Sequence, residues 1–218
     1  MQLIHQFIAR QLGKPQGLFG HLAMGHILAQ GNASLNAWVR GLLPLQPTST
    51  ILDLGCGPGA ALQAIAQQTP SGFAVGLDYA SPMARQAYRR NRQLIRTGHA
   101  GIVQGDAAML PFRDQAFNIV YAVNVIYFWP DVHQALREIW RILQPGGTLA
   151  LGTRPQAQVE HLAFMRHGLN VFHDSEIGEL LSMMGFVAVE RHVQPDATGL
   201  GALCTLGRRP EAMSGGGE

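Results

Sequence analysis

The sequence predicts an α/β fold in which a mostly parallel sheet of seven strands carries helices on both faces. Two observations lead to this prediction. From Thr50 onward, short apolar runs alternate with segments of helical period, as expected of repeated βαβ units. The chain is also rich in apolar residues, with 47% hydrophobic and 14% charged residues, which suits a sheet buried on both faces.

Seven apolar runs are expected to form the strands. They are Ile51–Leu54, Phe73–Leu77, Ile102–Val103, Phe117–Val123, Thr148–Gly152, Phe186–Val193 and Gly201–Leu206. Helical spacing is found in Gly59–Gln68, in a segment that starts near Ser81, in Asp131–Leu143 and in Ser175–Met184. We expect Ser81 to be an N-cap with Pro82 at the first helical position. We also expect Pro145-Gly146-Gly147 to stop the third of these helices and lead into the fifth strand.

The chain divides into three parts. Residues 1–43 read as two or three helices with breaks at Pro15–Gly17 and Gly31–Asn32. They are too few to form a core of their own, so we expect a helical cover over the domain that follows. Residues 44–209 form that domain, and residues 210–218, which end in Ser214-Gly-Gly-Gly-Glu218, are expected to be a disordered tail.

Composition excludes several classes of partner. The formal net charge is +2 and the basic residues are spread along the chain, so nucleic acid is not expected to bind. No stretch approaches the roughly 18 apolar residues that a membrane span requires. Cys56 and Cys204 lie far apart and form no zinc-binding spacing with the histidines, so we expect no metal and a cytoplasmic location. The oligomeric state is not predicted.

The strongest chemical signal is a glycine turn that follows the first strand, Ile51-Leu-Asp-Leu-Gly-Cys-Gly-Pro-Gly59. Glycine lets a ligand approach the backbone and accepts positive φ angles in a tight turn. The Gly55-x-Gly57-x-Gly59 spacing departs from the GxGxxG of dinucleotide sites, which argues against a nicotinamide dehydrogenase. Asp78 ends the second strand about 20 residues later, where a carboxylate can bind ribose hydroxyls.

In this order, the motifs resemble those of the class I S-adenosylmethionine-dependent methyltransferases, which have a Rossmann-like fold. The resemblance covers Thr50–Arg208 and rests on Ile51–Gly59, Gly76–Asp78, Gly105–Ala107 with Leu110–Phe112, and Arg141–Gly147. Within the class, the chain looks closest to the quinone-methylating and related small-molecule branch. The resemblance implies S-adenosylmethionine as cofactor and methyl transfer to a small-molecule acceptor.

The resemblance also assigns cofactor-binding roles. The methionine part would contact Asp53, Gly55, Cys56, Gly57 and Gly59. Asp78 would bind the ribose, while Asp106 and the Ala107 N–H would bind adenine between Tyr79 and Met83. Val123 and Asn124 would lie near the ammonium and the transferable methyl. From their residue types alone, Asp106 could instead be a turn residue, Met83 a core residue and Asn124 the cap of its strand.

No catalytic residue is assigned, because the cofactor supplies the reactive methyl group and the protein mainly aligns the acceptor. Phe19, His21 and Met24 of the cover are expected to face the acceptor. Tyr127 is expected either to line the acceptor site or to pack in the core, and Tyr127 and His21 are the candidate bases. Two alternatives stay open: a non-catalytic partner subunit that binds the cofactor, and another transferase that uses S-adenosylmethionine on the same fold.

Overall fold

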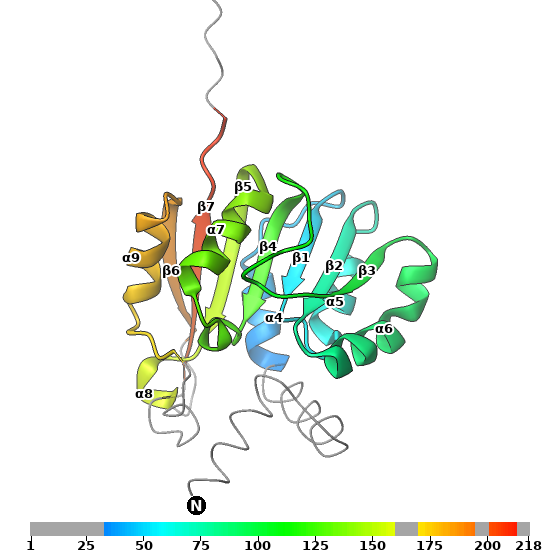
Figure 1. Ribbon diagram of the computed structural model, residues 1–218, viewed down its shortest axis with the longest axis horizontal. Coiled ribbons are helices and arrows are strands. Elements are labelled where there is room, and N and C mark those ends of the chain that lie inside the picture. Colours follow the sequence, from blue (N-terminus) through cyan, green and yellow to red (C-terminus); the bar gives the residue numbers. More distant parts are fainter. Residues whose placement is uncertain (1–32, 160–169, 195–200, 213–218) are drawn as a thin grey trace, which may run out of the picture.

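The computed structural model describes residues 33–159, 170–194 and 201–212. Within these residues the chain forms one seven-stranded sheet with the strand order β3-β2-β1-β4-β5-β7-β6, which Figure 1 shows from right to left. The strands are β1 (Thr50–Leu54), β2 (Phe73–Asp78), β3 (Ala100–Gln104), β4 (Phe117–Val123), β5 (Leu143–Thr153), β6 (Val187–Gln194) and β7 (Ala202–Arg208). The first five are parallel, whereas β7 runs antiparallel to β5 and β6. The predicted fold class is confirmed.

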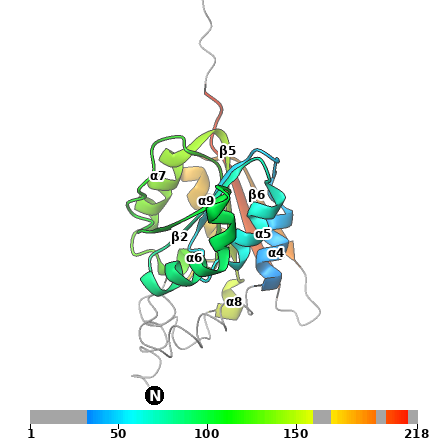
Figure 2. The same cartoon turned by 90° about the vertical axis from the view of Figure 1, so that its right-hand side faces the viewer.

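Helices cover both faces of the sheet, as Figure 2 shows from the side. They are α4 (Ala33–Gly41), α5 (Ala60–Gln68), α6 (Ser81–Arg96), the 3₁₀ turn η2 (Ile126–Phe128), α7 (Val132–Ile142), α8 (Gln156–Val159) and α9 (Glu176–Met183). On one face, α7 and α9 pack on Leu52, Val120 and Leu149. On the other, α4 and α5 pack on Ile51 and Ile119. Alternate residues of each buried strand therefore face opposite cores, which explains the continuous apolar runs in the sequence.

The expected boundaries of β3, α6 and β5 are wrong, and β3 spans Ala100–Gln104 rather than Ile102–Val103. The N-cap of α6 is Ala80 rather than Ser81, and the Ala80 N–H donates to the Asp78 Oδ1 at 2.8 Å. Strand β5 begins at Leu143, so it contains the Pro-Gly-Gly sequence that we expected to precede it. Its pairing with β4 shifts register between Phe117 and Ile119, and this irregularity accommodates the left-handed Gly146, whose φ is 74°.

Helix α4, the described part of the expected cover, packs directly on the sheet. Its Leu35 and Val39 are 1% and 0% exposed. The Tyr121 hydroxyl of β4 donates to the Asn36 backbone carbonyl at 3.1 Å. A Cβ atom at Gly152 would lie 2.8 Å from Val39. Helix α4 therefore completes one face of the core.

The described end of the chain, up to residue 212, packs against the sheet. The Gly146 N–H donates to the Pro210 carbonyl at 3.3 Å, so the first residue of the expected tail contacts β5. Residues 213–218 lie outside the described residues. None of the helices in residues 33–159, 170–194 and 201–212 is long and apolar enough to cross a membrane.

Candidate cofactor site

The glycine turn after β1 is held against the end of β2. The backbone N–H groups of Gly55 and Cys56 both donate to the Leu77 carbonyl, at 2.7 and 3.0 Å. The Gly57 N–H donates to the Asp78 Oδ2 at 2.8 Å. The turn is therefore fixed at the carboxyl edge of adjacent parallel strands, the edge at which open α/β sheets bind ligands.

Each glycine of the turn has a left-handed backbone, with φ angles of 75°, 51° and 77° at Gly55, Gly57 and Gly59. A Cβ at Gly55 would overlap the Val125 side chain, and one at Gly59 would lie 2.9 Å from the Ala87 Cα. At Gly57 a Cβ would meet no atom within 4 Å, so that side of the turn is open. The turn can therefore bring its backbone close to a ligand at Gly57.

Asp53 is the only buried carboxylic acid among the candidate cofactor residues, with 3% of its surface exposed. Burial, together with the nearby Asp78 carboxylate, raises its pKa to about 8. Its Oδ2 has no hydrogen-bond partner among the described residues. A buried carboxylate oxygen without a donor is costly, and a cationic group such as the ammonium of a bound amino acid would satisfy it.

Asp78 and Tyr79 follow β2 at the same edge. Both Asp78 oxygens already accept backbone N–H groups, from Gly57 and from Ala80, each at 2.8 Å. Burial raises the pKa of Asp78, and the two hydrogen bonds oppose that rise. A carboxylate oxygen can accept more than one hydrogen bond, so the acid can hold the turn and also bind hydroxyl groups. The Tyr79 ring is half exposed beside it.

Asp106 and Ala107 lie on the loop after β3. The Gly105 N–H donates to the Asp78 carbonyl at 3.1 Å, which places the start of this loop beside the ribose-binding candidate. The Asp106 Oδ1 accepts the Ala108 N–H at 2.9 Å, so Asp106 does act as a turn residue, while its side chain stays exposed. No described residue accepts a hydrogen bond from the Ala107 N–H, although Ala107 itself is buried.

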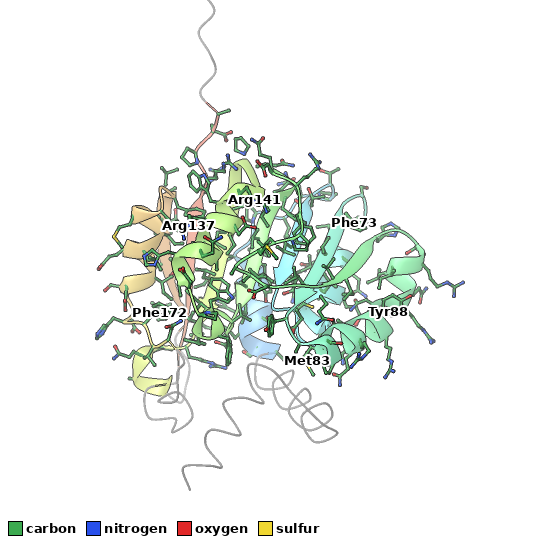
Figure 3. The ribbon with its side chains drawn as sticks, in the orientation of Figure 1. Phe73, Met83, Tyr88, Arg137, Arg141 and Phe172 are labelled. Carbon is green, nitrogen blue, oxygen red and sulfur yellow. The ribbon has the colours of Figure 1, made fainter. Side chains whose placement is uncertain are left out.

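Polar side chains on one face of α7 bind the backbone of this loop. The Gln134 amide donates to the Ala108 carbonyl at 3.0 Å, and the Glu138 Oε2 accepts the Leu110 N–H at 2.8 Å. Arg141 donates to the Leu110 carbonyl at 3.0 Å and also pairs with Glu138. Figure 3 shows Arg141 on α7 above this loop. Sequence reasoning missed Gln134 and Glu138, although their spacing with Arg141 puts all three on one side of the helix.

The other predicted cofactor residues lie around the same edge. Met83 is 3% exposed on the inner side of α6, so it is a core residue whose ring contact stays a prediction. Cys56 is buried, with its Sγ 3.8 Å from the Gly57 carbonyl. Val123 is buried at the end of β4, and Asn124 beyond it has a φ of 55°, which turns the chain sharply. The Asn124 N–H donates to the Gly152 carbonyl at 2.8 Å.

Asn91 is a further residue that the sequence did not single out. This α6 side chain is 1% exposed and donates to the Gly59 carbonyl at 3.0 Å and to the Ala87 carbonyl at 2.9 Å. It therefore ties the last glycine of the turn to α6. A buried asparagine at helical spacing from apolar residues was the signal that could have found it.

Tyr127 is engaged with the backbone rather than free for proton transfer. Its hydroxyl accepts the Arg154 N–H at 2.8 Å and donates to the Arg154 carbonyl at 3.3 Å. Burial raises its pKa to about 12. These contacts argue for packing at this position and against a general base at neutral pH. The three predicted acceptor residues of the cover, Phe19, His21 and Met24, lie outside the described residues.

Fold and site together define an α/β protein in which three carboxylates, Asp53, Asp78 and Asp106, lie at or just after the ends of the parallel strands β1, β2 and β3 near the glycine turn. Residues 52–151 match the family described as Methyltransferase domain. This match, together with the relatives and the solved structure described next, supports a class I S-adenosylmethionine-dependent methyltransferase with S-adenosylmethionine as its cofactor. In the described part of the chain, no group of three His, Cys, Asp or Glu side chains could hold a metal ion.

Named relatives support the family. The chain is 32% identical over 139 residues to a demethylmenaquinone methyltransferase of Roseiflexus castenholzii, covering 61% of this chain and 57% of that one. It is 31% identical over 126 residues to the 27-O-demethylrifamycin SV methyltransferase of Amycolatopsis mediterranei, covering 57% and 46%. The chain thus spans about half the length of these relatives. A solved S-adenosylmethionine-dependent methyltransferase of Aquifex aeolicus matches its fold with a TM-score of 0.71 at 16% identity, covering 85% of this chain and 97% of that one.

Proposed function

We propose that the protein transfers the methyl group of S-adenosylmethionine to a small-molecule acceptor. The observation that carries the proposal is the buried Asp53 oxygen without a donor, beside the open glycine turn and Asp78 at one sheet edge. Asp53 would pair with the ammonium of the cofactor, and Asp78 would bind its ribose. The Ala107 N–H and Asp106 would bind adenine, with Tyr79 against the ring.

When bound, the cofactor supplies a methyl group on a sulfonium, which is reactive without further activation. The chain's own residues then have to hold the acceptor in line with that methyl group and keep water away. The end of β4, at Val123 and Asn124, borders the place where this alignment would occur. No step requires a proton to move to Tyr127, whose hydroxyl stays bonded to Arg154.

The relatives' names guide the choice of acceptor. They name demethylmenaquinone and a demethylated rifamycin, both small molecules, so we test quinone-type acceptors first. Water-soluble quinol analogues, phenols and thiols complete the panel of acceptors. We also propose that the protein acts in the cytoplasm.

The first experiment incubates the purified full chain with cofactor labelled in the methyl group and with each acceptor. We expect a labelled product together with equimolar S-adenosylhomocysteine, and a loss of turnover at low cofactor concentration in Asp78→Ala. Calorimetric titration with NAD serves as the specificity control. Tighter binding of NAD than of S-adenosylhomocysteine would overturn the cofactor assignment. Cofactor binding without transfer to any acceptor would favour a non-catalytic partner subunit.

We also propose that residues 1–32 select the acceptor and exclude water, since in open α/β sheets ligands sit beyond the carboxyl ends of the strands and a preceding segment can cross that edge. Phe19, His21 and Met24 are the residues that we expect to contact the acceptor. Deletion of residues 1–30 leaves α4 and its contacts with the sheet in place. The proposal predicts that this truncated protein binds the cofactor normally and loses turnover. Full turnover by a truncated protein that is folded by circular dichroism would refute it.

A further inference from the structure

One helix concentrates the positive charge of the molecule. Helix α6 carries five of the chain's arginines and no acidic residue. All five side chains are exposed, and none has an ion pair or hydrogen bond among the described residues. They are Arg85, Arg89, Arg90, Arg92 and Arg96. Five of the chain's sixteen basic residues are therefore gathered on one element of the fold.

Four of these arginines form a straight stripe. The steps from Arg85 to Arg89, Arg92 and Arg96 are four, three and four residues, which place successive side chains on one side of an α-helix. The stripe is about 17 Å long at the helical rise per residue. Tyr88 flanks it with a side chain that is 55% exposed. Figure 3 shows Tyr88 on the outer side of α6, at the β3 end of the molecule.

The surroundings of α6 do not neutralise the stripe. Across residues 55–105, which supply α5, β2, α6 and β3, the only carboxylate is Asp78, at the glycine turn. The opposite end of the sheet carries acidic side chains on and beside α9 and β6, among them Glu176, Glu179 and Glu190. The sheet thus has a strongly basic helix at its β3 end, whereas acidic side chains outnumber basic ones on α9 and β6 at the other end, where Arg191 also lies. Such charge asymmetry is typical of proteins that bind an anionic surface.

We propose that the arginine stripe of α6 docks the protein on an anionic lipid bilayer. The inner side of α6, with Met83, Ala84 and Ala87, is buried against the domain, so the helix cannot insert and contact is made through its charged side. Arginine pairs well with phosphate groups, and an exposed tyrosine suits the boundary between water and lipid.

The position of the carboxylates favours a bilayer over a nucleic acid. A strand of nucleic acid that followed the stripe towards the glycine turn would meet Asp78 and Asp106 near the start of α6, where its phosphates would be repelled. A bilayer needs only a flat contact along the stripe. The inference rests on the proposed function in one respect: quinone-type acceptors are apolar and collect in lipid, so docking there would bring enzyme and acceptor together.

The test measures co-sedimentation of the full chain with vesicles of phosphatidylcholine, with and without phosphatidylserine. The variant R89Q/R92Q removes two charges of the stripe and keeps a good helix former at both positions. R113Q/R191Q removes two exposed arginines elsewhere and is the matched control. We expect binding only when phosphatidylserine is present, and its loss at high salt. Because each arginine near an anionic leaflet changes partitioning by about fivefold, R89Q/R92Q should bind roughly 25-fold less, and the control should bind normally.

Equal binding to both vesicle types, or equal loss in the two double variants, would overturn the proposal. A duplex oligonucleotide is included as competitor at the same phosphate concentration. If it displaces the protein from vesicles and its own binding is lost in R89Q/R92Q, a nucleic acid is the partner and the lipid proposal fails. Vesicle binding is measured without cofactor or acceptor, so it does not depend on the proposed function. Methyl transfer to a water-soluble acceptor, with R89Q/R92Q beside the unaltered chain, reports on that function separately.

Discussion

Replacing Glu138 by alanine tests whether α7 positions the adenine side of the site. The Glu138 carboxylate accepts the Leu110 N–H at 2.8 Å and pairs with Arg141 at the same distance. Leu110 is 3% exposed, so its N–H would lose its acceptor where water hardly reaches it. Leaving a buried donor unsatisfied costs about 1–3 kcal/mol. The ion pair, whose side chains are 15% and 32% exposed, adds less than about 1 kcal/mol.

We therefore expect Glu138→Ala to lower the free energy of unfolding by about 2 kcal/mol. For a domain of this size that corresponds to a fall in Tm of roughly 4–8 °C. Because the same loop carries Asp106 and Ala107, we also expect the Kd of S-adenosylhomocysteine to rise about threefold to tenfold, which is up to about 1.4 kcal/mol. Glu138→Gln, whose amide oxygen can still accept from Leu110, should give a smaller change in both quantities.

The assay combines thermal unfolding with calorimetric titration of S-adenosylhomocysteine and of its analogue in which an oxo group replaces the adenine amino group. Discrimination between the two ligands should fall in Glu138→Ala, because the loop that we propose to contact that amino group would be less well fixed. The control is His133→Ala, an exposed position of the same helix. If Tm falls while affinity and discrimination stay at the control values, the reasoning is refuted and α7 only stabilises the fold.

Three further predictions follow from the glycine turn and its acids. Asp78→Asn should weaken binding of S-adenosylhomocysteine by about 1.5–3 kcal/mol, nearly as much as Asp78→Ala. The reason is that the new amide N–H group would face one of the two backbone N–H donors from which Asp78 now accepts. A calorimetric affinity close to that of the unaltered protein would contradict this. Gly59→Ala should lower Tm and abolish cofactor binding, because the φ of Gly59 is 77° and the new Cβ would lie 2.6 Å from the Asn91 Nδ2. A soluble variant with an unchanged Tm would exclude this steric argument. Because burial raises the pKa of Asp53 from 3.8 to about 8, the folded state holds a proton that the unfolded chain releases, and the free energy of unfolding of the ligand-free protein should fall as pH rises between those values. The side chain of Asp53→Asn cannot ionise, so the Tm of this variant relative to that of the unaltered protein should rise from pH 5 to pH 8, while its cofactor binding is weaker. Parallel curves of Tm against pH for the two proteins would refute this.

Most of the fold could be predicted because its signals are local. A buried parallel strand is a short apolar run and its partner helix has a visible period, so β4 was expected with the bounds that it has. The start of β5 was misplaced because proline and glycine normally mark turns, whereas here the irregular pairing with β4 absorbs them. Strand β3 was expected over two residues only, because Gly101 interrupts its apolar pattern.

In the candidate site, too, the local features could be predicted and the long-range contacts could not. The glycine turn and Asp78 belong to contiguous motifs, so they could be found in the sequence. The bonds from Glu138 to Leu110 and from Asn91 to Gly59 join positions about 30 residues apart and involve a backbone partner that any residue supplies. Such pairs leave no pattern in the residue types. The stripe on α6 was overlooked for another reason, because the net charge of the whole chain does not reveal five arginines on a single helix that has no acidic residue.

The central place of β7 in the sheet has a consequence for synthesis of the chain. Strand β7 pairs with β5 on one side and with β6 on the other, yet it is the last of the three to be made. Until residues 202–208 leave the ribosome, β5 presents an open edge of buried residues such as Leu149 and Leu151, and β6 has no strand to pair with. Open edges of this kind invite pairing between chains. The nascent protein therefore depends on residues 202–208, which are made after the other six strands, to close the sheet. A premature stop before residue 202 should yield an aggregating product even though all the candidate cofactor residues have already been made.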